Sequence, residues 1–161
     1  MQRPEFESLL CYNLALGWRL VNAFYKPYLP EGISPQQTYV LECCFMNQGI
    51  HMGDLAACIE LDLAAVSALV SRMEKQELLS REIDTANRRH IKVYLTGKGK
   101  RIRDQVAKSL TMADKKIFKL VRKEDFKGLR SVIQVLRQVT ERKEINSIPN
   151  KNKLLQEEAP S

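Results

Sequence analysis

Residues 54–99 decide the fold expected for this chain, and they read DLAACIELDLAAVSALVSRMEKQELLSREIDTANRRHIKVYLTGKG. Two short segments with helical spacing of apolar residues come first, and two segments that alternate in strand fashion follow. A basic turn joins the two alternating segments. The order predicts two short helices, a hairpin and the start of another helix.

The second of these helices has an apolar inner face and a small, polar outer face. Asp62 suits the N-cap position, and its carboxylate also suits the positive end of the helix dipole. The inner face predicted by the spacing holds Leu63, Val66, Leu69, Val70 and Met73. The outer face and its flanks hold Ala64, Ala65, Ser67, Ala68, Ser71, Arg72 and Lys75. Such a face is either ordinary solvated surface or a surface that approaches a nucleic-acid groove closely.

The hairpin that follows this helix favours the second interpretation, in which the outer face approaches a nucleic-acid groove. Residues 79–84 and 91–96 alternate, and Ile91, Val93 and Leu95 are expected to point inward. The turn between them, residues 85–90, carries Arg88 and Arg89 side by side. A helix-turn-helix followed by such a hairpin is a winged helix. Its second helix enters the major groove of double-stranded DNA while the wing reaches phosphates or a minor groove.

Charge is concentrated in the same region. Residues 62–103 contain ten Lys and Arg against five Asp and Glu, which gives +5 of the whole chain's +7. Clustering of this kind is the electrostatic footprint of a phosphate-binding face.

The rest of the chain predicts further helices, so the fold class is mainly α with a small β-wing. They cover about residues 5–29, 34–47, 96–121 and 124–142. Ser34, Pro35 and Gln37 are expected to form the N-terminal cap of the second of these, and Thr96 that of the third. Tyr39 to Phe45 are expected to face inward. Residues 1–32 and 104–142 carry more apolar surface than a winged domain covers, which indicates dimerisation helices around a DNA-binding domain at 33–103. Residues 143–161 are expected to be a flexible tail.

Composition excludes several other classes. The 44% hydrophobic and 28% charged residues describe a globular protein, and no apolar run is long enough to span a membrane. The N-terminus lacks an apolar secretory block, so we expect a cytoplasmic protein. Four cysteines without C-x-x-C spacing and two histidines predict no metal site, and the cysteines are expected to be mostly buried small hydrophobes. No catalytic constellation or glycine-rich cofactor loop is present, so we expect neither an enzyme nor a cofactor.

The chain resembles the MarR family of winged helix-turn-helix regulators over about residues 5–140. The resemblance rests on DLAACIELD leading into VSALVSRMEKQELLSREID, then TANRRH, then VYLTGKG. It implies a homodimeric repressor that binds a pseudo-palindromic operator. Ser67, Ala68, Ser71 and Arg72 match positions that contact DNA in the family, and Arg88 and Arg89 match the wing tip.

Two departures from the family pattern matter. Ala64, Ala65 and Ala68 stand where the family often has Ser, Thr or Arg, so specificity is expected to lean on thymine-methyl contacts and on groove shape read by the wing. Glu60 occupies a turn position that is often Gly, where a positive φ costs a non-glycine residue about 1 kcal/mol.

The stretch LLCYNLALGWRLVNAFYKPYL is similar to the organic-hydroperoxide-sensing branch of the family. Cys11 matches the oxidised cysteine of that branch, and Tyr25 matches a tyrosine that bonds it. The two residues lie about 21 Å apart along a straight helix, so they meet only if Tyr25 comes from the other subunit. Pro35 and Ala15 replace two supporting tyrosines of the branch, which predicts a less reactive thiol.

The sequence therefore leaves two alternatives for the signal that releases the protein from DNA and two for its function. The releasing signal is either a hydroperoxide that oxidises Cys11 or a small aromatic ligand bound between the dimerisation helices and the winged domain. The alternative to a DNA-binding regulator is a protein-interaction module, an antirepressor, on the same fold.

Overall fold

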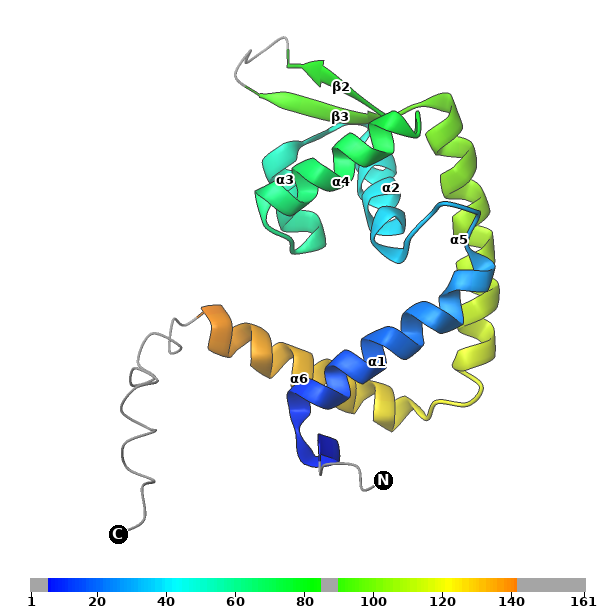
Figure 1. Ribbon diagram of the computed structural model, residues 1–161, viewed down its shortest axis with the longest axis vertical. Helices are drawn as coiled ribbons and strands as arrows, with labels where there is room; N and C mark the ends of the chain where they lie inside the picture. Colours follow the sequence, from blue (N-terminus) through cyan, green and yellow to red (C-terminus); the bar gives the residue numbers. More distant parts are fainter. Residues whose placement is uncertain (1–5, 85–89, 142–161) are drawn as a thin grey trace. The chain divides into compact units, whose positions relative to one another are not determined.

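The computed structural model describes residues 6–84 and 90–141, which fall into two compact units divided between Lys115 and Lys116. The larger unit contains the winged helix (Figure 1). Its elements are, in chain order, the 3-10 turn Phe6–Ser8, α1 Leu10–Tyr25, the 3-10 turn Lys26–Tyr28, α2 Pro35–Asn47, β1 Ile50–His51, α3 Met52–Ile59, α4 Leu63–Lys75, β2 Leu79–Ile83, β3 Ile91–Leu95 and most of α5 Gly97–Ile117. The smaller unit contains α6 Lys123–Glu141. The mainly helical fold with a small sheet confirms the predicted fold class.

Local capping signals begin three of the helices. Ser34 and Gln37 form a reciprocal capping box at α2, with Pro35 at the first helical position. The Asp62 carboxylate accepts a hydrogen bond of 2.8 Å from the Ala65 backbone N–H at the start of α4. The Thr96 hydroxyl accepts one of 2.9 Å from the Gly99 N–H at the start of α5. Each cap satisfies a backbone donor that the helix leaves without an internal partner, as the sequence predicted.

The sheet has three antiparallel strands in the order β1-β3-β2. The hairpin register pairs Leu79 with Leu95 and Ile83 with Ile91, and β1 pairs Ile50 with Val93. The sequence did not predict β1, because two residues are too few to show an alternating pattern. Its pairing makes β3 the central strand.

The core lies between α2, α3, α4 and the sheet. α4 contributes Val66, Leu69, Val70 and Met73, and the other elements contribute Val40, Leu41, Cys44, Ile50, Leu55, Ala56, Leu78, Leu79 and Val93. Gly99 lets α5 start against this core, because a Cβ there would lie 2.0 Å from the Leu78 carbonyl oxygen.

Several predictions of burial and extent were wrong. Leu63 is 56% exposed because the first turn of α4 lies beyond the core, and Ile91 is exposed because it pairs with Ile83 at the turn end of the hairpin. Tyr39 and Phe45 of α2 are exposed as well. The first helix begins at Leu10 and gives way to a 3-10 turn at Lys26, where Pro27 follows. The predicted tail at 143–161 and the wing tip at 85–89 lie outside the described residues.

Apolar side chains cover much of the surface of α1 and α6. α1 has no buried residue, and Leu10, Trp18, Leu20 and Val21 are exposed. On α6 the exposed ones are Phe126, Leu129, Ile133, Val135 and Val139. Over the described residues, no helix combines the length and the apolar character needed to cross a membrane.

Leu55→Ala and Leu63→Ala compare a core leucine with a surface leucine of the same winged domain. Leu55 is fully buried, so its truncation should lower the free energy of unfolding by about 2–5 kcal/mol. Leu63→Ala should change it by less than about 1 kcal/mol. Urea denaturation followed by circular dichroism measures both values, and equal losses would contradict the observed position of the core.

Candidate nucleic-acid interface

The outer face of α4 consists of small and basic side chains. Ala64, Ala65, Ala68, Arg72 and Lys75 are exposed, and Ser67 and Ser71 are half-buried. The buried face of α4 lies opposite and holds the helix against the core, so the outer face is fixed in direction. A helix with a smooth outer surface can approach a groove more closely than one with bulky side chains.

The turn before α4 has the backbone that the sequence predicted. Glu60 ends α3 in the left-handed region with φ of 54°. The backbone N–H groups of Glu60 and Leu61 donate to the carbonyl oxygens of Ala57 and Ala56. These hydrogen bonds hold Glu60 in the left-handed conformation, and Asp62, two residues later, caps α4.

Arg81 of β2 binds α4 directly, and the sequence did not predict this. Its Nη2 donates to the Ser67 carbonyl oxygen at 3.1 Å and to the Ser71 hydroxyl at 2.8 Å. Its Nε lies 3.1 Å from a carboxylate oxygen of Glu74. Because Ser67, Ser71 and Glu74 lie on successive turns of α4, these contacts fix the helix relative to the hairpin. The Ser71 hydroxyl is engaged within the protein, which reduces its capacity to read a base.

The base of the wing is held by Asp84, which is largely buried. Lys92 Nζ lies 3.2 Å and His51 Nε2 lies 3.4 Å from the same Asp84 oxygen. The Asp84 backbone N–H donates to the His90 carbonyl oxygen at 2.9 Å and closes the hairpin next to the tip. These contacts fix the two arms from which the tip extends. Arg88 and Arg89 themselves lie outside the described residues.

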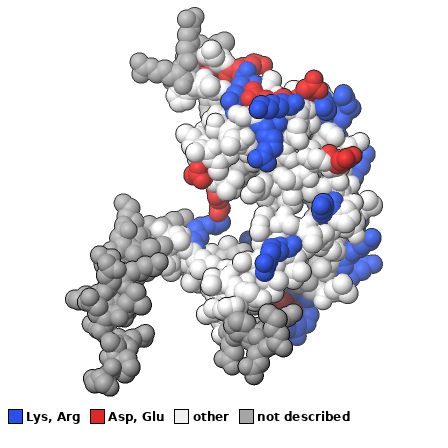
Figure 2. Space-filling model, in the orientation of Figure 1, with Lys and Arg blue, Asp and Glu red and all other residues white. Residues whose placement is uncertain are grey.

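Charges of both signs surround the hairpin. Figure 2 shows Lys and Arg side chains near the strands at the top of the view, with Asp and Glu among them, and further Lys and Arg along α5 at the right. Several of the acidic groups pair with basic ones, such as Glu74 with Arg81 and Glu77 with Lys98. The visible surface is therefore a mixed one, and Arg72 and Lys75 provide the positive charge on α4 itself.

Arg103 joins α5 to α2. Its Nε and Nη2 each donate to a different oxygen of Glu42 at 2.8 Å, and its guanidinium lies 3.8 Å from the centre of the Phe45 ring. A bidentate pair of this kind fixes orientation as well as distance. The stacking on Phe45 also accounts for an apolar side chain at the surface of α2.

Cys11 and Tyr25 lie at opposite ends of α1, as predicted. Cys11 is exposed. The Tyr25 hydroxyl donates to the Asp114 carboxylate of α5 in the same chain. Burial, and then this hydrogen bond, raise the pKa of Tyr25 to about 12. The contact of Tyr25 with Cys11 of a second subunit stays a prediction, and Asp114 is a partner that the sequence did not indicate.

The expectation of mostly buried, inert cysteines was wrong for three of the four. Cys43 of α2 and Cys58 of α3 form a disulfide, and Cys11 is exposed. Only Cys44 fits the expectation, since it is buried and burial raises its pKa to about 12. A separation of 15 residues between Cys43 and Cys58 carries no recognisable motif, so the pairing had no sequence signal.

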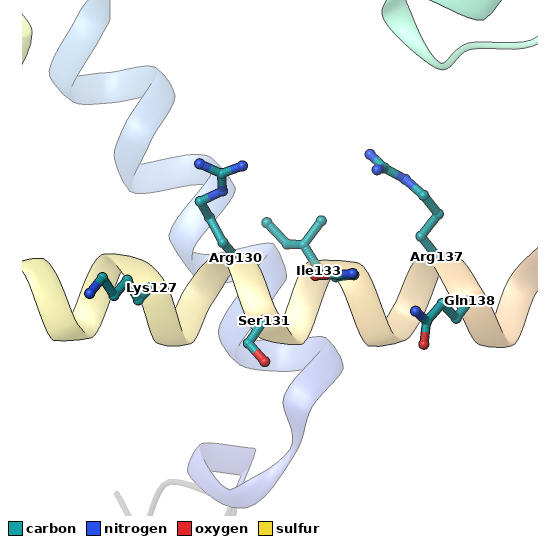
Figure 3. Close-up of a pocket in the computed structure, with 7 residues that line it drawn as sticks. Lys127, Arg130, Ser131, Ile133, Arg137 and Gln138 are labelled. Atoms are coloured by element: carbon teal, nitrogen blue, oxygen red, sulfur yellow. The ribbon is translucent and has the colours of Figure 1, made fainter.

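A hollow of about 880 Å³ lies along α6. Figure 3 shows Arg130, Ile133 and Arg137 extending from one side of the helix there. Because all the lining residues belong to one helix, the hollow is an open surface and gives no enclosed binding cavity. Among the described residues, no group of three or more His, Cys, Asp and Glu could hold a metal ion.

Comparison with known proteins agrees with this geometry. The sequence pattern of the MarR family matches residues 33–91, which run from the start of α2 to the second strand of the wing. Residues 33–91 therefore match a MarR family domain. The HTH-type transcriptional regulator MgrA of Staphylococcus aureus is 27% identical over 105 residues, 64% of this chain and 71% of MgrA.

Two solved structures of regulators share the fold. PcaV of Streptomyces coelicolor, in complex with its natural ligand, has a TM-score of 0.77 at 14% identity and covers 87% of this chain and 99% of its own. BpsR of Bordetella bronchiseptica, whose DNA binding is regulated by 6-hydroxynicotinic acid, has a TM-score of 0.68 at 19% identity. The match covers 86% of this chain and 98% of the BpsR chain. At these identities, the two structures show that this chain shares the fold of the two regulators. The organic-hydroperoxide-sensing branch is not distinguished by these matches.

A double-mutant cycle on Arg81→Ala and Ser71→Ala tests whether Arg81 holds α4. Loss of the guanidinium removes hydrogen bonds to two groups of α4, so each single variant should lower the free energy of unfolding. The coupling between the two changes should be about 1 kcal/mol. Urea denaturation of the four proteins gives this value, and strictly additive effects would show that the contact contributes nothing to stability.

Proposed function

We propose that this protein is a homodimeric DNA-binding repressor that is released from its operator by a chemical signal. The observation that carries the proposal is the outer face of α4, held in position by its buried face and by Arg81. In a winged helix this face enters the major groove. Arg72 and Lys75 would bind phosphates or base edges there, and the alanines would contact thymine methyl groups.

The wing would add a second contact with DNA. Its two strands are held by the contacts of Asp84 with His51 and Lys92. Arg88 and Arg89 lie between these strands in the sequence, and they would supply the contact. Arginine at the tip of a wing suits a narrow minor groove or the phosphates that border it. Because α4 offers few polar side chains, this contact would supply much of the sequence preference.

Dimerisation would use residues 1–32 and 104–142. α1 and α6 carry apolar side chains that are exposed in the single chain, and burying them would stabilise an assembly. A twofold-symmetric dimer would place two α4 helices about one turn of DNA apart, which matches a pseudo-palindromic operator.

The signal would act by changing the dimer geometry. Arg103, bound to Glu42, and Tyr25, bound to Asp114, connect α5 to α2 and to α1, so a shift of α5 would move the DNA-binding domain. Oxidation of exposed Cys11 is one candidate signal. A small aromatic ligand is the other, and it is supported by the ligand-regulated DNA binding of BpsR.

Selection of bound genomic DNA, repeated with and without a hydroperoxide, tests the proposal. Arg72→Ala should weaken binding to the selected DNA by about tenfold, because it removes one charged contact per subunit. Lys108→Ala removes a charge from an exposed position of α5 and should leave affinity within about twofold. Fluorescence anisotropy measures both.

Failure to enrich any DNA, with a folded dimer, would contradict the proposal. The alternative would then be a protein-interaction module, an antirepressor, that keeps the fold and has lost base reading. Equal effects of the two variants would show that α4 is not the contacting face.

A further inference from the structure

The Cys43–Cys58 disulfide joins α2 to α3, the first helix of the helix-turn-helix, and the proposed function makes no use of it. Cys58 is exposed, whereas Cys43 is half-buried and packs against the core. The Cα atoms lie 6.9 Å apart, so neighbouring helices α2 and α3 hold the two residues within reach of each other. Both cysteines line a surface hollow of about 380 Å³ with Tyr39, Glu42, Ile59 and Glu60.

We propose that Cys43 and Cys58 form a reversible dithiol–disulfide pair that hydroperoxides oxidise. We further propose that the bond fixes α3 against α2 and so preserves the DNA-binding arrangement of α4. The effect on DNA binding rests on the function proposed above. The site is distinct from Cys11, which lies on α1 outside the winged helix.

The exposure of the two sulfurs sets the order of the chemistry. The Cys58 thiolate would attack the peroxide, its sulfur gaining one oxygen as the O–O bond breaks and an alcohol leaves. The Cys43 thiol would then attack the Cys58 sulfenic acid, forming the S–S bond and releasing water. Two thiols lose two electrons and two protons in total, and the hydroperoxide is reduced to alcohol and water.

Cys44 would not compete in this reaction. It is adjacent to Cys43 in sequence, but it faces the core, and burial raises its pKa to about 12. Its thiol therefore stays protonated, while thiolate is the reactive form. The hollow beside Cys43 and Cys58 would admit a small thiol, whose attack frees one cysteine and leaves a mixed disulfide on the other. A second small thiol then attacks the mixed disulfide, restores the second cysteine and leaves as the small-molecule disulfide.

The position of the bond determines its expected effect. α3 leads through Glu60 and Asp62 directly into α4, so a cross-link between α3 and α2 holds the segment that orients α4. In the structure, the disulfide coexists with the packed core and with the Arg81 contacts that hold α4, so forming the bond does not disturb the arrangement of α4. Oxidation here should therefore maintain DNA binding, whereas oxidation at Cys11 is proposed to release it.

The full chain carrying Cys11→Ser isolates the pair, since three cysteines remain. We expect intact mass spectrometry after cumene hydroperoxide to show a loss of two hydrogens. Alkylation with N-ethylmaleimide in denaturant should then modify one thiol, against three in the reduced protein. In Cys11→Ser/Cys58→Ser, the loss of two hydrogens should disappear. Three alkylated thiols after peroxide in the Cys11→Ser protein would overturn the proposal.

The thermal midpoint and DNA affinity test the effect of the bond. Oxidised Cys11→Ser protein should unfold at a temperature higher by about 5–10 °C than its reduced form, and should bind the selected DNA at least as tightly. If the bond forms and DNA binding is lost, or the midpoint does not rise, the proposed role in fixing α3 is contradicted. If the bond forms and neither redox state binds DNA, the proposed function fails and the redox pair stands.

Discussion

Burial of one face of α4 is the constraint on which the winged helix depends. Val66, Leu69, Val70 and Met73 pack into the same core as α2, α3 and the sheet, so the helix cannot rotate without exposing them. Because these four side chains are buried, only the opposite face of α4 is exposed and can contact another molecule. The residues on the buried face determine the direction in which Ala64 and Ala68 point. Because these two side chains are small, the outer face of α4 can approach a groove closely.

Polar contacts at the edges of the core connect this helix to the rest of the chain. Arg81 binds α4 from the hairpin, and Arg103 binds α2 from α5. Each arginine makes at least two hydrogen bonds, so each contact fixes an orientation and not only a distance. A movement that begins at α5 would therefore reach α2, and through the shared core it would reach α4 and the wing. In the proposed function, this connection would carry the effect of a signal at α5 to the face of α4 that contacts DNA.

The sequence predicted those features that depend on neighbouring residues. Ser34, Asp62 and Thr96 each cap the helix that directly follows them, and the left-handed Glu60 lies in a short turn, so local rules were sufficient. Burial at element ends was predicted poorly, because periodicity does not show where the core stops, and Leu63 and Ile91 lie beyond it. Arg103 with Glu42 and Cys43 with Cys58 join residues distant in sequence, and no spacing rule indicates such pairs. Arg88 and Arg89 lie outside the described residues, so their role stays a prediction.

The central claim is that α4 and the wing bind the phosphate backbone and grooves of DNA. The salt dependence of affinity for the selected DNA tests it most directly, because each phosphate contact releases counterions. With Arg72, Lys75 and the wing arginines of two subunits engaged, affinity should fall by roughly ten-thousandfold between about 50 and 200 mM salt. A logarithmic slope near zero would contradict the claim.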